Sequence, residues 1–277
     1  MIDMYRSVLK YPGSKWNIAN QIVSMLPKHH SYVEPFFGSG AVLFSKNPSD
    51  IETINDLDND VVNLFRCIKE DSEKLARLVA TTPFSRTEYD ESFDNCMNIT
   101  ELSYEKALNF LVRCWQGHGF RTNGYKCGWK NDVQGRERAY SLWNWYRLPE
   151  WILDIAERLR MVQIENRPAI ELIKRFNYKN VLMYLDPPYV LDTRAGKQYK
   201  HEMSDTDHEE LLRTILQSDA QIIISGYKSD MYNDYLKDWN KKTFLSNAEH
   251  GLKREEVVWF NFETDKQMCL FDFIGEQ

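Results

Sequence analysis

The stretch LMYLDPPYV, residues 182–190, is an apolar run that stops at a carboxylate, continues through two prolines and ends near an aromatic ring. Consecutive apolar positions are typical of a strand that is covered on both faces of a sheet. Each proline disfavours helical geometry in the residue before it, so we expect the chain to stay extended past the strand end. The run therefore predicts a buried strand that delivers polar groups to the carboxyl edge of a sheet.

The residues DPPY that follow this strand offer acceptors rather than donors. Asp186 carries a carboxylate and Pro187 a carbonyl, while Pro187 and Pro188 both lack a backbone N–H. Asp186 and the Pro187 carbonyl are therefore suited to accept both protons of an amino group, and Tyr189 offers a flat face on which a base can stack. The alternative interpretation is a proline turn with a capping aspartate.

Further β-rich runs alternate with helix-like segments and predict an α/β fold. A mostly parallel sheet with helices on both faces follows from this alternation. One helix is expected to begin at Asp58 or Asn59, and another after Thr206 as N-cap with Glu209 three residues on. The further runs are SYVEPF (31–36), IETIND (51–56), MVQIEN (161–166), QIIISG (221–226) and EVVWFNF (256–262).

The middle of the chain, residues 71–159, lacks the strand pattern. Helical periodicity appears at residues 104–115 and 148–159, around the Gly-rich aromatic loop QGHGFRTNGYKCGW at residues 116–129. We therefore predict a helical insert between two parts of a sheet domain.

The segment VEPFFGSGAVLF, residues 33–44, predicts a strand, a glycine loop and a helix. Gly38 and Gly40 permit a tight turn and close backbone approach to a ligand at the strand end. The third glycine of the dinucleotide fingerprint is missing, and a bare G-x-G is also compatible with a plain turn.

Two charged residues strengthen the case for a nucleoside-containing cofactor without a dinucleotide pyrophosphate. Asp56 follows the glycine loop by about one strand-helix-strand unit, where an acid can accept from both ribose hydroxyls. Its alternative role is a helix N-cap, which Asp58 or Asn59 can fill instead. Lys15, in LKYPGSK (9–15), is placed to neutralise a carboxylate on such a cofactor.

Composition limits the class of protein. The chain has 277 residues and a net charge of −6, with five scattered cysteines that indicate neither a disulfide framework nor a zinc ribbon. We find no signal peptide and no apolar run long enough for a membrane span, so we expect no membrane partner and a cytoplasmic location. The negative charge argues against a nucleic-acid partner in general.

One local stretch has the opposite charge. Residues 118–138 hold five Lys or Arg against two acids, interleaved with Phe120, Tyr125 and Trp129. A solvated polar loop and a DNA-contacting loop both fit this pattern. Side-chain type favours Arg121, Asn123 and Lys126 as DNA contacts, and Lys197, in the loop after DPPY, as a further one.

The motifs KYPGSK, EPFFGSG, INDLD and LDPPYV, in this order and around a helical insert, resemble those of the Dam-like DNA adenine methyltransferases of bacteria and bacteriophages, the alpha group of amino-methyltransferases. The resemblance covers essentially the whole chain. It implies a Rossmann-like seven-stranded sheet, S-adenosylmethionine as methyl donor without a metal, and methyl transfer to a flipped-out adenine of double-stranded DNA. It also divides the chain into a catalytic domain, 1–70 and 160–277, and a target-recognition insert, 71–159.

The resemblance also implies roles for individual residues. Asp56 would bind the donor ribose, and Asp186, Pro187, Pro188 and Tyr189 would hold the target adenine, with Asp186 also bordering the donor. The methionine end of the donor would contact Tyr11, Gly13 and Lys15. The donor pocket would be lined by Glu34, Pro35, Phe36, Gly38 and Gly40. The adenine ring of the donor would contact Asn166 and Arg167, where the match to the family is looser than elsewhere.

Several alternatives stay open at this level. The same acceptor geometry suits the amino group of cytosine or of an RNA base, and the fold also suits a catalytically silent DNA-binding relative. A cognate restriction endonuclease is an open partner. The clusters formed by His201, Asp205, Asp207 and His208, and by Cys114, His118 and Cys127, resemble metal ligands. We interpret them as helix-cap and packing residues, so no metal site is expected.

Overall fold

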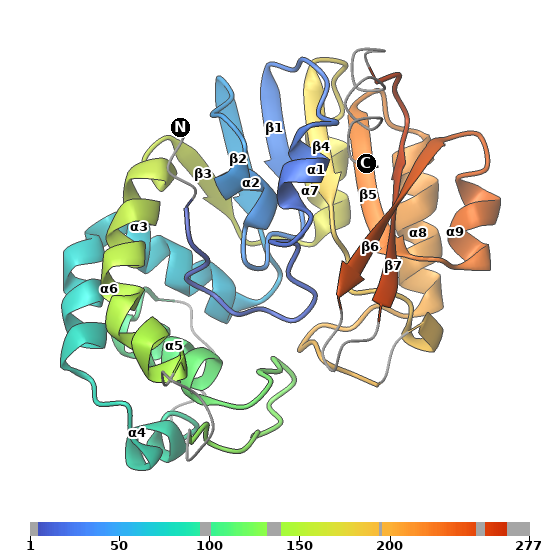
Figure 1. Ribbon diagram of the computed structural model, residues 1–277. Coiled ribbons are helices and arrows are strands. Elements are labelled where there is room, and N and C mark those ends of the chain that lie inside the picture. The colour runs from blue at the N-terminus through green and yellow to red at the C-terminus, as the bar shows by residue number, and fades with distance from the viewer. Residues whose placement is uncertain (1–4, 95–100, 132–139, 194–195, 248–252, 265–277) are drawn as a thin grey trace, which may run out of the picture.

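The computed structural model describes residues 5–94, 101–131, 140–193, 196–247 and 253–264. A seven-stranded sheet crosses the molecule in the order β3-β2-β1-β4-β5-β7-β6 (Figure 1). This confirms the α/β class and the seven strands that the resemblance implied. The strands are β1 (Ser31–Glu34), β2 (Ile51–Asn55), β3 (Val162–Glu165), β4 (Val181–Leu185), β5 (Gln221–Tyr227), β6 (Asn240–Asn247) and β7 (Lys253–Phe260).

The DPPY strand lies at the centre of this sheet. β4 pairs in parallel with β1 on one side and with β5 on the other, and all five of its residues are buried. The first five strands in the sheet order are parallel, whereas β7 runs antiparallel to both β5 and β6. The residue pattern indicated the other six strands but not β6, whose run NKKTFLSN is too polar at its start to stand out.

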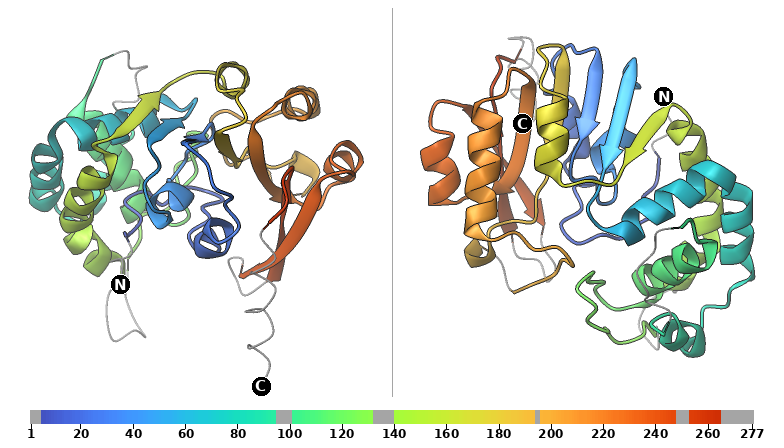
Figure 2. Two further views of the ribbon diagram at one scale, coloured as in Figure 1. Left: turned by 90° about the horizontal axis from the view of Figure 1, so that it is seen from above. Right: turned by 180° about the vertical axis from the view of Figure 1, so that it is seen from behind.

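Helices cover both faces of the sheet (Figure 2). On one face, α7 (Ala169–Arg175), α8 (Asp205–Leu216) and α9 (Asp230–Tyr235) pack on Val181, Met183 and Leu185 of β4. On the other face, α1 (Ala19–Val23), α2 (Ala41–Ser45) and α3 (Asn59–Thr81) pack on Leu182 and Tyr184. The alternation along β4 thus supplies both cores, as expected for a strand covered on two faces.

Two helix starts show how local sequence sets the elements. Asp58 caps α3, because its side chain accepts from the amide of Asp60. The cap of α8 is Ser204, which forms a reciprocal capping box with Asp207. The expectation of Thr206 as that cap was wrong, since the Ser204 hydroxyl finds an acidic partner three residues on.

The helices of the insert form one body with one face of the sheet. α4 (Arg86–Glu91), α5 (Tyr104–Gln116) and α6 (Tyr140–Leu159) share with that face a single apolar cluster. α3 runs through residue 71, the expected start of the insert, and loses helical geometry at Asp71. No helix among the described residues is long and apolar enough to cross a membrane.

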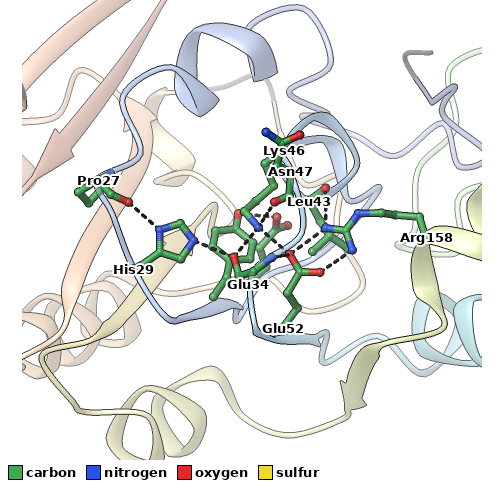
Figure 3. A network of polar contacts seen from close by, with 10 residues as sticks. Pro27, His29, Glu34, Leu43, Lys46, Asn47, Glu52 and Arg158 are labelled. Carbon is green, nitrogen blue, oxygen red and sulfur yellow. Dashed lines mark hydrogen bonds and ion pairs between the residues drawn. The ribbon is translucent and has the colours of Figure 1, made fainter. Parts of the chain in front are cut away.

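A buried ion network joins α6 to the sheet. Figure 3 shows Arg158 of α6 and Lys46 converging on the carboxylate of Glu52 in β2. Lys46 Nζ lies 2.6 Å from Glu52 Oε1, and Arg158 contacts both carboxylate oxygens. Burial alone would raise the pKa of Glu52, but hydrogen bonds from Arg158 and Lys46 lower it below its usual value. The last helix of the insert is therefore tied to β2 by charge as well as by apolar contact.

Candidate active site

A cavity of about 250 Å³ opens at the carboxyl ends of β1, β2 and β4. The strand order reverses between β1 and β4, and open α/β sheets bind ligands at such switch points. The cavity collects most of the residues that the sequence assigned to a donor or a target base. Of those residues, Tyr11, Gly13, Lys15, Glu34, Pro35, Phe36, Gly38, Asp56, Arg167, Asp186 and Pro188 line it.

The glycine loop and Asp56 hold one another at this edge. Gly38 and Gly40 both adopt positive φ, at 49° and 69°, which a residue with a side chain rarely does. The Gly38 amide donates to Asp56 Oδ2 over 2.8 Å, and the Asp58 amide donates to Asp56 Oδ1 over 2.8 Å. Burial raises the pKa of Asp56 to about 7, although these amide donors oppose the shift.

Asp58, two residues on, places a second carboxylate on the cavity wall. Its Oδ1 accepts from the amide of Asp60 and lies 3.3 Å from Lys200 Nζ. Its Oδ2 is buried and has no hydrogen-bond partner. An unsatisfied buried carboxylate oxygen costs free energy, and burial raises the pKa of Asp58.

Asn55, the last residue of β2, clamps three loops together. Its side-chain amide nitrogen donates to the carbonyl oxygens of Pro35 and Arg167, over 2.8 and 3.0 Å. Its side-chain oxygen accepts from the Arg167 amide over 2.9 Å. The ends of β1, β2 and β3 are thereby fixed to one another at the cavity, which Asn55 also lines.

Both carboxylate oxygens of Asp186 are held from the protein side. Lys15 Nζ lies 3.0 Å from Asp186 Oδ2, and the Ser225 hydroxyl of β5 donates to Asp186 Oδ1 over 2.8 Å. Burial alone would lower the pKa of Lys15, but the carboxylates of Asp186 and Glu256 raise it above its usual value. A carboxylate has about four lone-pair sites, so Asp186 retains capacity for a further donor.

Tyr189 is buried beside the cavity. Its hydroxyl donates to Glu256 Oε2 of β7 over 2.6 Å, and its ring meets the Tyr227 ring edge to face, with centroids 4.5 Å apart. Lys15 Nζ lies 4.7 Å from the centre of the same ring. The orientation of this tyrosine is therefore set by residues from three separate segments.

The remaining predicted residues of the pocket lie around the cavity without lining it. Gly40 is the N-cap residue that precedes α2. Pro187, the residue after Asp186 in the chain, is buried. Asn166 is exposed, and its side-chain amide donates to the carbonyl oxygen of Asp56 over 2.8 Å.

The residues predicted to contact DNA lie on the exposed loop of the insert and on the segment after DPPY. Arg121 stacks over Tyr125, and Lys126 pairs with Asp90. Asn123 donates to the carbonyl oxygen of Lys197 over 3.0 Å, so the structure brings these two together. Arg121, Asn123, Lys126 and Lys197 are all exposed.

The comparisons with known proteins agree with this geometry. Residues 11–258 match the model of one protein family, the D12 class N6 adenine-specific DNA methyltransferases. The chain belongs to this family. Because the family acts on adenine in DNA, the alternatives of a cytosine or an RNA acceptor are decided in favour of DNA adenine, and the resemblance found in the sequence is confirmed.

Individual relatives of the methyltransferase are similar over most of its length. A type II methyltransferase of Lactococcus lactis subsp. cremoris, M1.LlaDCHI, is 26% identical over 90% of each chain. M.MjaIII of Methanocaldococcus jannaschii is 24% identical and covers 91% of this chain and 96% of its own. The DNA adenine methylase of Haemophilus influenzae is 25% identical over 67% of this chain and 64% of its own.

The two groupings of cysteine, histidine and acidic residues noted in the sequence are not arranged as metal sites in the described part of the chain. Among the described residues, no group of three or more His, Cys, Asp or Glu side chains is arranged to hold a metal ion. His208 is buried in α8, where its Nδ1 lies 2.9 Å from the Tyr232 hydroxyl. Asp207 belongs to the capping box of the same helix.

Sequence reasoning did not identify three residues that support the site of the methyltransferase. Asn55, Ser225 and Glu256 are buried polar side chains within or at the end of apolar strands. That pattern is itself a signal, because a buried polar group requires a partner. The identity of the partner, however, depends on which strands are neighbours.

Proposed function

We propose that this methyltransferase moves a methyl group from S-adenosylmethionine to the N6 amino group of an adenine taken out of double-stranded DNA. Asp186 and the Pro187 carbonyl are the acceptors that hold that amino group. The observation that carries this proposal is the position of Asp186 on the cavity wall, between Lys15 and Ser225.

The cavity residues fit the donor. Its ribose hydroxyls suit Asp56. Lys15 and the backbone of Tyr11 and Gly13 suit the methionine end, while Arg167 and Asn166 border the place for the adenine ring. When bound, the donor supplies a methyl group on a sulfonium that is open to nucleophilic attack. The pocket roles of Glu34, Pro35, Phe36, Gly38 and Gly40 are part of the same proposal.

The chain contributes by making the amino group a better nucleophile. The lone pair of an exocyclic amino group is delocalised into the ring, which makes the nitrogen planar and weakly nucleophilic. Two preorganised acceptors favour the tetrahedral nitrogen and stabilise the positive charge that develops on it. Lys15 and Ser225 fix the Asp186 carboxylate before the base arrives, so little reorganisation is left for the reaction itself.

Target binding requires the base to leave the stack. Extrusion costs a few kcal/mol, and stacking on an aromatic ring returns about 1–3 kcal/mol per base. We assign the stacking role to Tyr189, whose ring orientation is held by Glu256 and Tyr227. Pro188 keeps this turn free of a competing amide donor.

Residues 71–159 form the target-recognition part in this proposal, and residues 1–70 and 160–277 the catalytic part. Arg121, Asn123, Lys126 and Lys197 would contact the DNA, and phosphate contacts predict that binding weakens steeply with salt. A cognate restriction endonuclease is proposed because two relatives are named type II methyltransferases.

The direct test uses labelled S-adenosylmethionine and plasmid DNA from a methylation-deficient host. After digestion to nucleosides, we expect the label in N6-methyldeoxyadenosine and in no other nucleoside. The same incubation with heat-denatured plasmid should transfer less label, because the insert is expected to bind the duplex. Absence of label in methyldeoxyadenosine would contradict the proposed function.

A further inference from the structure

Thr122, in the exposed loop of the insert, contacts the segment that follows DPPY. Its amide donates to the Gln198 carbonyl over 2.9 Å, and its hydroxyl accepts from the Lys200 amide over 2.9 Å. The neighbouring Asn123 adds a third hydrogen bond, to the Lys197 carbonyl. The loop that we assign to DNA is thus tied at Thr122 and Asn123 to residues 197–200.

Residues 199–203 form a wall of the donor cavity. Tyr199, Glu202 and Met203 line it. The Tyr199 hydroxyl donates to the Pro12 carbonyl over 3.0 Å, and the Tyr199 ring lies against the Tyr11 ring with centroids 5.9 Å apart. The segment that holds the DNA loop therefore also holds the loop that carries Tyr11, Pro12 and Gly13.

A shorter path joins the two sites as well. The Thr122 side chain interacts with Tyr11, whose pKa it lowers against the larger raising effect of burial, and Tyr11 lines the donor cavity. Lys200, whose amide donates to Thr122, places its Nζ 3.3 Å from Oδ1 of Asp58, which also lines the cavity. Thr122 is therefore linked through Lys200 to Asp58, and through residues 198–200 to Tyr199, both of which line the cavity.

We propose that Thr122 is a positioning residue that couples DNA bound at the insert loop to the donor pocket, so that DNA tightens donor binding. This rests on the proposed donor and DNA sites. Arg121 and Asn123 flank Thr122, so DNA held by these side chains restrains the same backbone that holds Tyr199 and Tyr11. A restrained wall has less freedom to lose when the donor binds, which gives positive cooperativity. The coupling is reciprocal, because both affinities are equilibrium quantities.

The test measures binding of labelled S-adenosylhomocysteine by equilibrium dialysis, with and without plasmid DNA from a methylation-deficient host. This ligand allows no turnover. We expect the wild-type protein to bind it more tightly with DNA present. The coupling ratio is the dissociation constant without DNA divided by the dissociation constant with DNA. We expect this ratio to fall about 2- to 12-fold in Thr122→Val, the range for one hydrogen bond. Thr122→Ser, which keeps the hydroxyl, should restore the ratio. Thr214→Val, at a partly buried position of α8, should leave it unchanged.

A second variant separates coupling from folding. Tyr199→Phe keeps the ring and removes the hydrogen bond to Pro12 at the other end of the path, so it should also lower the ratio while melting near the wild-type temperature. A wild-type ratio of one, or an unchanged ratio in both Thr122→Val and Tyr199→Phe, would overturn the inference. If the wild-type protein binds no S-adenosylhomocysteine at all, the donor site of the proposed function fails and the inference fails with it.

Discussion

Lys15 Nζ lies 3.0 Å from Asp186 Oδ2, which places a buried cation against the carboxylate that we assign to the target amino group. Lys15 was expected to neutralise a carboxylate of the donor. The structure gives it a second partner within the protein, so in the proposed function this one cation would border both the donor and the target base.

Replacing Lys15 by Met should slow methyl transfer even when the donor is saturating. A hydrogen bond to a charged group contributes about 1.5–3 kcal/mol, so we expect the single-turnover rate to fall about 10- to 150-fold. Ser225→Ala should have a smaller effect, because it removes no charge from the site. Lys28→Met, at an exposed lysine, is the control. An unchanged rate for Lys15→Met at saturating donor would show that this lysine serves donor affinity alone.

Donor affinity should depend on pH through Asp56. Its pKa is raised to about 7 by burial, and the ionised carboxylate is the form that accepts from two hydroxyls. Donor binding should therefore weaken as pH falls from 8 to 6 and level off above about 8. Equilibrium dialysis with labelled S-adenosylhomocysteine across this range measures the effect.

The control for this prediction has to exclude Glu34, a second cavity carboxyl whose pKa burial raises to about 8. Asp56→Asn should bind the donor more weakly and with a flat pH profile, whereas Glu34→Gln should keep the slope. If the pH dependence survives in Asp56→Asn and disappears in Glu34→Gln, the titrating group is Glu34 and the prediction for Asp56 is wrong.

Arg158 is predicted to stabilise the fold through its pairing with Glu52. Breaking a buried ion pair by removing one partner costs about 3–5 kcal/mol, so Arg158→Met should lower the free energy of unfolding by that amount in urea denaturation. Arg160→Met, two residues on in an exposed pair with Glu157, should cost about 1 kcal/mol or less. Equal costs for the two variants would mean that the network does not fix α6 to the sheet.

The same network predicts the effect of acid. The folded-state pKa of Glu52 is lowered by Arg158 and Lys46, against the effect of burial. Its contribution to stability is therefore present above the unfolded value of about 4.3 and is lost as pH falls through the folded pKa.

The central strand and its polar end could be predicted because the information is local. An apolar run of five residues and two adjacent prolines define the end of β4 without reference to the rest of the chain. The glycine loop and Asp56 are equally local, because the strand-loop-helix unit that carries them is continuous in sequence.

The supports of the site could not be predicted in this way because they come from strand neighbours. Ser225 reaches Asp186 only because β5 lies beside β4, and Glu256 reaches Tyr189 only because β7 lies antiparallel to β5. The strand β6, which completes this edge, has no clear pattern of its own. Likewise, Thr122 stood between two predicted DNA contacts, but its link to residues 198 and 200 depends on how the insert folds back on the sheet.

The single-turnover rate of Asp186→Asn tests the central claim most directly. The substitution keeps the size of the side chain and the carbonyl oxygen but removes the charge that favours positive character on the target nitrogen. With donor and plasmid DNA both saturating, we expect the methyl-transfer rate to fall by at least about 100-fold, in line with the loss of one preorganised partner, while both dissociation constants change little. A rate within about threefold of wild type would contradict the assignment of Asp186 as the acceptor for the adenine amino group.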